Sequence, residues 1–427
     1  MRIDVCSVLR RRRIWRAPAS AAPPDVPSWV PAAGSVATLT QTNGGLSNTF
    51  RSQVASNYQA AFFVKTVNDY SGAVSNPHWG TYGAKVFFGG GHSATNDNSV
   101  TVAEYGASAI TFKRVSVPTN WPGTDPDDLS NIYTTPDLNL TYMEALADGQ
   151  LGSPHSYHCG DIIAPADGGA AYGTFLQVVC GAIGYNGSGD PNGAAAAHQM
   201  LFDSLELGTR KWARRTNNTG GFTFGAPLYT VLVPAQQRVY IFHQGGGLPA
   251  AVRWFNLSTD AYVLGSGAAS LEIDAMDGFD SGRIFHVPSR NLIVGCWPAS
   301  NLLKVQWMDV SASQPTLGGT ATLSSSLAVS DPWSMACWCP DNNRIIVGGV
   351  NSDSGAVHEI EIPATLSDTW TVTRRAFPSG TMPKGDTSSG LTYKKFDYDS
   401  GVKSIVYMPL AASSGDDTVW VYRPVGT

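Results

Sequence analysis

Short runs of alternating hydrophobic and polar residues recur along most of the chain and predict β-strands rather than helices. In the clearest repeating unit, an apolar run is followed by a proline-containing turn, a second apolar run and a glycine-rich stretch. Good copies begin at Leu228 (LYTVLVPAQQRVYIFHQGGG), Gly282 (GRIFHVPSRNLIVGCWP) and Ser334 (SMACWCPDNNRIIVGG). The unit therefore predicts a pair of antiparallel strands joined by a tight turn.

This unit repeats at a regular interval. The turn prolines Pro234, Pro288 and Pro340 are about 52 to 54 residues apart, which is a spacing typical of propeller blades. Weaker copies at residues 84–91, 174–184 and 396–410 bring the number of units to six, and third and fourth alternating runs follow in most of them. Four strands per repeat make one propeller blade. We therefore predict an all-β fold, a single β-propeller of about six four-stranded blades, or of seven if residues 117–153 form a further blade.

The last unit lacks an outermost strand, because its third run at residues 419–422 is followed by only a few residues. The run SVATLT at residues 35–40 alternates correctly and precedes the first unit. We expect this N-terminal strand to pair into the last blade and close the ring, which would protect edges that an open array exposes. The predicted domains are a basic arm rich in proline and alanine at residues 1–34 and a β-propeller at residues 35–427.

The glycines of the repeats resemble a known family. Glycines 89–91 precede Tyr105, and Gly348 and Gly349 precede Trp370, an arrangement similar to the double glycine and spaced aromatics of kelch repeats. Residues 35–427 thus resemble the propeller of the kelch and galactose oxidase superfamily. The resemblance to galactose oxidase implies a copper ion held by two tyrosines and two histidines. No such ligand set can be placed on matching positions here, so we predict no metal and no cofactor.

Composition narrows the range of partners. Only 14% of the residues are charged and the net charge is -5, so we expect neither nucleic acid nor an anionic membrane as a partner. No apolar run is long enough to span a membrane, and the arginines near the N-terminus are not followed by the apolar segment of a signal peptide. The six cysteines lack the spacing of a zinc site. Localisation stays open, with a virion or extracellular protein as hypotheses.

The connections predict where binding takes place. Turns between the first and second strands of a blade are tight and open on one face, the tight-turn face, whereas long connections gather on the other, the long-connection face. Long loops on a rigid scaffold commonly carry function. Histidines there suit acid–base chemistry or metal binding, or else cap loops; aromatics suit sugar stacking or belong to the core. The binding candidates are His92, Asp97, His155, His158, Asp161, Tyr185 and Trp297.

These observations leave more than one function open. The first is a non-enzymatic interaction or structural module, for example a virion or surface-appendage component that binds a protein assembly partner or a surface glycan. The alternative is a carbohydrate-directed enzyme, a sugar oxidase or glycosidase with its site at the channel mouth, which rests on fold analogy alone. A glycan-binding propeller without catalysis falls between them. No catalytic residue is predicted, and the oligomeric state stays open.

Overall fold

The fold is known from a computed structural model of the 427-residue chain. The structure describes residues 25–47, 72–88, 99–116, 159–178, 196–208, 210–217, 228–243, 251–269, 271, 281–330, 333–351, 353–377, 394–408 and 418–427.

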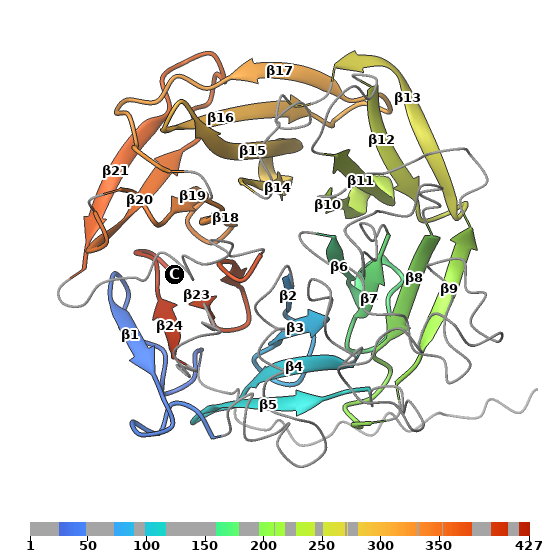
Figure 1. Cartoon of the computed structure of the whole chain (residues 1–427), viewed down its shortest axis with the longest axis vertical. Helices are drawn as coiled ribbons and strands as arrows, with labels where there is room; N and C mark the ends of the chain where they lie inside the picture. The colour runs from blue at the N-terminus through green and yellow to red at the C-terminus, as the bar shows by residue number, and fades with distance from the viewer. Residues whose placement is uncertain are drawn as a thin grey trace, which may run out of the picture.

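The strands form six four-stranded sheets that stand around a common centre as the blades of a β-propeller (Figure 1). Blade 1 contains β2 (Ala73–Asn76), β3 (Ala84–Phe88), β4 (Val100–Tyr105) and β5 (Ile110–Arg114). Blade 2 contains β6 (Gly160–Ile163), β7 (Thr174–Gln177), β8 (Ala196–Leu201) and β9 (Trp212–Asn217). Blade 3 contains β10 (Leu228–Val233), β11 (Arg238–His243), β12 (Ala251–Asn256) and β13 (Ala261–Ala269).

The remaining three blades complete the ring. Blade 4 contains β14 (Arg283–Val287), β15 (Leu292–Ala299), β16 (Leu302–Asp309) and β17 (Thr316–Thr320). Blade 5 contains β18 (Ala336–Cys339), β19 (Arg344–Val347), β20 (Ala356–Glu361) and β21 (Thr371–Ala376). Blade 6 contains β22 (Tyr398–Asp399), β23 (Ser404–Tyr407), β24 (Val419–Tyr422) and, outermost, β1 (Val36–Leu39). The predicted all-β propeller of six four-stranded blades is therefore confirmed.

The innermost strands follow one another around the centre, and that of blade 6 contacts that of blade 1. Six blades thus make a complete ring. Residues 117–153, which the sequence offered as a seventh blade, lie outside the described residues.

The N-terminal strand closes the ring as predicted. β1 pairs antiparallel with β24 over four residues, from Val36 opposite Tyr422 to Leu39 opposite Val419. The chain then crosses to blade 1, where Ser47 donates its backbone N–H to the carbonyl of Ile110 at 3.0 Å. One segment therefore joins the last blade to the first.

Residues 25–34, which the sequence analysis assigned to the arm, contact blade 1 through Ser28 and Trp29 and blade 6 through Gly34, whose N–H donates to the carbonyl of Arg423. Trp29 is 8% exposed and its indole Nε1 donates to the carbonyl of Gly106 at 2.8 Å. Its ring packs edge-on against Tyr105, with centroids 5.8 Å apart. Residues 1–24 lie outside the described residues.

The proline turns have a simple backbone cause. Pro234 and Pro288 begin the short 3-10 turns η4 (Pro234–Gln236) and η6 (Pro288–Arg290), where the missing N–H of proline costs no hydrogen bond. Gln237 and Asn291 follow with φ of 52° and 51° and reverse the chain. These turns keep the first two strands of a blade close together on the tight-turn face.

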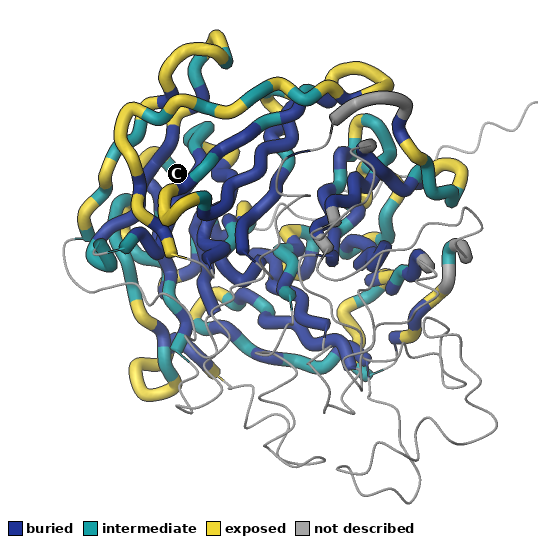
Figure 2. Tube along the Cα trace, turned by 45° about the horizontal axis from the view of Figure 1, so that its top comes forward, coloured by how far each residue is buried: buried dark blue, intermediate teal, exposed yellow. Residues whose placement is uncertain are grey.

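Apolar side chains fill the spaces between neighbouring blades, so each blade is stabilised by the next. The largest cluster spans blades 4, 5 and 6, and Figure 2 shows the buried positions along the strands with exposed ones at the turns. Cys159, Cys296, Cys337 and Cys339 are buried free thiols in these layers. In the described part of the chain, no helix has the length and hydropathy needed to cross a membrane.

Candidate functional site in the central channel

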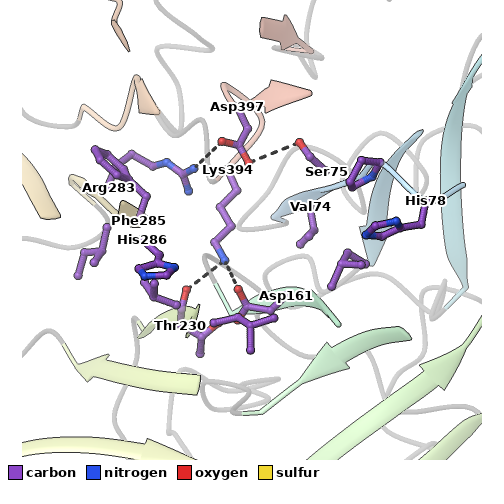
Figure 3. A pocket seen from close by; sticks show the side chains of 15 residues that line it. Val74, Ser75, His78, Asp161, Thr230, Arg283, Phe285, His286, Lys394 and Asp397 are labelled. Carbon is purple, nitrogen blue, oxygen red and sulfur yellow. Dashed lines mark hydrogen bonds and ion pairs between the residues drawn. The ribbon is translucent and has the colours of Figure 1, made fainter. Parts of the chain in front are cut away.

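Buried cations reach the backbone of the innermost strands from inside the channel. The inner edge of each blade has no further strand to pair with, so its carbonyl groups need other donors. Lys394, just before β22, donates from Nζ to the carbonyls of Gly160 at 2.6 Å and Thr230 at 3.1 Å. The same nitrogen lies 3.4 Å from Oδ1 of Asp161. Lys394 therefore links blade 6 to blades 2 and 3 across the channel (Figure 3).

Arg283 makes a second set of links from the first residue of β14. Its Nε donates to the carbonyl of Ala336 in blade 5 at 3.1 Å, and Nη2 lies 3.5 Å from Oδ1 of Asp397. Ser75 in blade 1 donates its hydroxyl to Oδ2 of Asp397 at 3.4 Å. We call Asp161, Thr230, Lys394, Arg283, Asp397 and Ser75 the ion layer; together these side chains connect all six blades.

A third buried pair joins blade 1 to blade 6. Lys85 is fully buried; Nζ donates to the carbonyls of Lys395, at 3.0 Å, and Val406, and lies 3.2 Å from Oδ2 of Asp399. Burial raises the pKa of Asp399 to about 6, although the attraction of Lys85 acts in the opposite direction. The cost of removing this carboxylate from water thus exceeds the stabilisation that Lys85 and Ser75 provide.

A cavity of about 280 Å³ adjoins the ion layer. Its walls include the apolar side chains of Val74, Leu232 and Phe285 and the imidazoles of His78 and His286. Since His78 follows β2, in the turn that leads to β3, the cavity extends along the channel to the tight-turn face.

Burial controls the protonation of the groups around this cavity. Desolvation lowers the pKa of His286 to about 4 and also lowers that of His78, where Asp167 opposes the shift. Both imidazoles are therefore neutral near pH 7. Desolvation raises the pKa of Asp161, against the effects of Lys394 and Thr230.

The structure places two of the predicted site residues. Asp161 lies in β6 and accepts hydrogen bonds from Lys394 at Oδ1 and from Thr230 at Oδ2, the latter at 2.6 Å. Trp297 lies in β15, is 2% exposed and packs in the core between blades 3 and 4, with Nζ of Lys304 5.7 Å from its ring centroid. The other candidates, His92, Asp97, His155, His158 and Tyr185, lie outside the described residues.

Most of the channel residues were missed by the sequence analysis. Arg283 and His286 lie in an innermost strand, where a mainly apolar run is expected because neighbouring blades cover both faces. A polar residue within such an apolar strand could have indicated a side chain in the channel. Asp161 and Thr230 are polar residues of this kind in two other innermost strands. Lys394 had no such signal, because it precedes the strand and reaches blades more than 160 residues away in sequence.

Among the described residues, no group of three or more histidine, cysteine, aspartate or glutamate side chains is placed to hold a metal ion. The arrangement does supply buried hydrogen-bonding groups at one end of a small cavity, with apolar walls beside them.

Comparisons with known proteins add little to this description. No family model and no curated protein matches the chain. Among solved structures it is similar to TolB from Acinetobacter baumannii, with 11% identity, a TM-score of 0.33 and coverage of 70% of this chain and 55% of that one. It is also similar to an auxiliary nutrient binding protein from Bacteroides ovatus, with 11% identity and a TM-score of 0.41. That match covers 83% of this chain and 69% of the other.

The chain is also similar to an engineered GH43 glycoside hydrolase with endo-xylanase and exo-arabinofuranosidase activity, with 12% identity and a TM-score of 0.37. That match covers 72% of this chain and 52% of the hydrolase. The chain thus spans just over half the length of the TolB and hydrolase chains that it matches. The molecule is a six-bladed β-propeller, and that assignment rests on its own strand order.

Proposed function

We propose that this protein is a non-enzymatic interaction module that uses its long-connection face to bind a protein assembly partner or a surface glycan. The observation that supports the proposal is the ion layer, whose charged side chains bond to one another and to inner-strand carbonyls. Lys394 has three N–H donors and three acceptors for them. These charges act as cross-links between blades, which suits a rigid scaffold.

Strand bounds support the choice of face. Long connections separate Phe88 from Val100, Arg114 from Gly160 and Gln177 from Ala196, whereas on the opposite face only four residues join the first two strands in blades 3 and 4. A rigid ring with long connections on one side is a common way to present variable contacts. The candidates His92, Asp97, His155, His158 and Tyr185 belong to these connections by sequence.

The finer parts of the proposal follow the sequence alone. The glycine and aromatic spacing favours a kelch-like propeller, and the low charge favours a virion or surface-appendage component. The basic arm that the sequence predicts at residues 1–34 would then dock the ring to a larger assembly.

The experiment compares glycan-array binding and solution mass, by light scattering, for the wild type and loop variants. His92→Ala and Tyr185→Ala change the long-connection face; Thr259→Ala, an exposed residue in the tight turn between β12 and β13, is the matched control. We expect glycan binding or self-assembly to weaken at least tenfold in the two loop variants and to persist in the control. Equal binding by all variants would refute the choice of face. Turnover of a sugar by the wild type would replace this proposal with the enzyme alternative.

A further inference from the structure

The cavity beside the ion layer has a closed floor and a partly open mouth. Asp161, Arg283 and Lys394 at the floor are at most 8% exposed. Ile162 and Leu232, further along the same inner strands toward the tight turns, are only half-buried. A ligand would therefore enter from the tight-turn face, opposite the long connections.

The volume limits the size of the occupant. Pockets for drug-sized ligands run from about 300 to 1,000 Å³, so a cavity of about 280 Å³ suits a compact molecule. A single sugar ring is of the right order, whereas a peptide or an oligosaccharide would extend beyond the mouth.

The charge balance favours a neutral ligand. Among the described residues that line the cavity, two carboxylates, Asp161 and Asp397, face two cations, Lys394 and Arg283, and each carboxylate lies within 3.5 Å of a cation. The imidazoles of His78 and His286 are neutral near pH 7 because burial lowers their pKa values. A charged ligand would add a buried charge without a counter-ion, which is costly.

The hydrogen-bonding balance favours a ligand with several hydroxyl groups. A carboxylate offers about four acceptor sites, and bonds from Lys394, Thr230 and the backbone N–H of Leu232 occupy three of those on Asp161. Asp397 likewise receives Arg283 on one oxygen and Ser75 on the other. The site thus has spare acceptors, which O–H donors match.

An imidazole nitrogen points to the same chemistry. His286 lines the cavity, and its Nε2 is buried with no hydrogen-bond partner among the described residues. A hydroxyl would satisfy this nitrogen in either tautomer, since a hydroxyl both donates and accepts. Val74, Leu232 and Phe285 provide apolar walls for the C–H faces of a ring.

From this combination of size, charge and acceptors, we infer that the central cavity binds a neutral polyhydroxy molecule the size of a monosaccharide, admitted from the tight-turn face. The inference does not rest on the proposed function, because the two sites lie on opposite faces of the ring.

Isothermal titration calorimetry on the full chain tests it with four neutral probes, D-glucose, D-galactose, D-mannose and L-arabinose, and two charged comparators, D-glucuronate and D-glucosamine. Leu232→Trp fills the mouth, and His286→Phe removes the imidazole nitrogens while keeping a ring. The matched control is Leu264→Trp, at an exposed position of β13. Circular dichroism melts establish that each variant is folded.

We expect at least one neutral sugar to bind with a dissociation constant below about 10 mM. Its affinity should fall at least tenfold in both cavity variants and stay unchanged in Leu264→Trp. If Leu232→Trp does not fold, His286→Phe decides the question. Absence of saturable binding by all four neutral sugars would overturn the inference. Tighter binding of a charged comparator would also overturn it, as would an affinity that is unchanged in both cavity variants.

Discussion

Replacing Lys85 with methionine tests whether the buried pair between blades 1 and 6 stabilises the closed ring. Methionine keeps much of the length of the side chain but removes the ammonium that lies 3.2 Å from Asp399. Both side chains are at most 3% exposed, so the variant leaves a buried carboxylate without its counter-ion. Breaking a buried pair from one side costs about 3–5 kcal/mol. We expect a loss of that size in the free energy of unfolding near pH 7.5.

The pH dependence separates the charge effect from lost packing. The pKa of Asp399 is raised from 3.8 to about 6 by burial, so its contribution to wild-type stability is fully present below 3.8 and is lost as pH rises through about 6. Without Lys85 the pKa rises further. Near pH 5 the carboxyl group is mostly neutral in both proteins, and the difference in stability should shrink by about half or more.

Equilibrium urea unfolding followed by tryptophan fluorescence measures this difference at about pH 7.5 and about pH 5. Lys211→Met, at an exposed position, is the control and should change stability by less than about 0.5 kcal/mol. The double variant Lys85→Met with Asp399→Asn should recover part of the loss, because it removes both charges. A loss under about 1 kcal/mol near pH 7.5, or an equal loss at both pH values, would refute the reasoning.

Two further substitutions test how the ring closes, both by urea unfolding. Gly401→Ala should destabilise the protein by about 3 kcal/mol, because a Cβ there would lie 2.2 Å from the carbonyl oxygen of Tyr82 in the neighbouring blade. Gly355→Ala, which meets nothing within 4 Å, should stay within about 0.5 kcal/mol, and equal effects of the two would contradict the close approach. Trp29→Ala should cost about 3 kcal/mol by removing a buried ring and its bond to Gly106; an unchanged midpoint would mean that residues 25–34 do not stabilise blade 1.

Much of the fold could be predicted because blades are local units. Each pair of strands around Pro234 or Pro288 is contiguous in sequence, so alternation and turn residues suffice to locate it. The closing strand was also predictable, since the last unit lacked a fourth strand and residues 35–40 had the right alternation. Regular spacing then implied the ring.

The channel could not be predicted in the same way. Lys85 is the one charged residue in an otherwise apolar strand, and although a lysine side chain normally faces water, this one is fully buried between blades. Lys394 meets Asp161 and Thr230 only because three separate blades converge on one axis. The local sequence pattern shows which face of a strand a side chain occupies. Which side chains from different blades meet in the channel depends on the geometry of the whole ring.

The strand pair that closes the ring also determines how the molecule responds to force. In the antiparallel register of β1 and β24, the start of β1 at Val36 lies opposite the end of β24 at Tyr422. The two flanking segments therefore leave the pair at the same end. Tension applied through them would load the backbone hydrogen bonds one after another, as in a zipper, rather than all together in shear. A ring held by buried ions and packed blades should thus open at low force when pulled through these flanks.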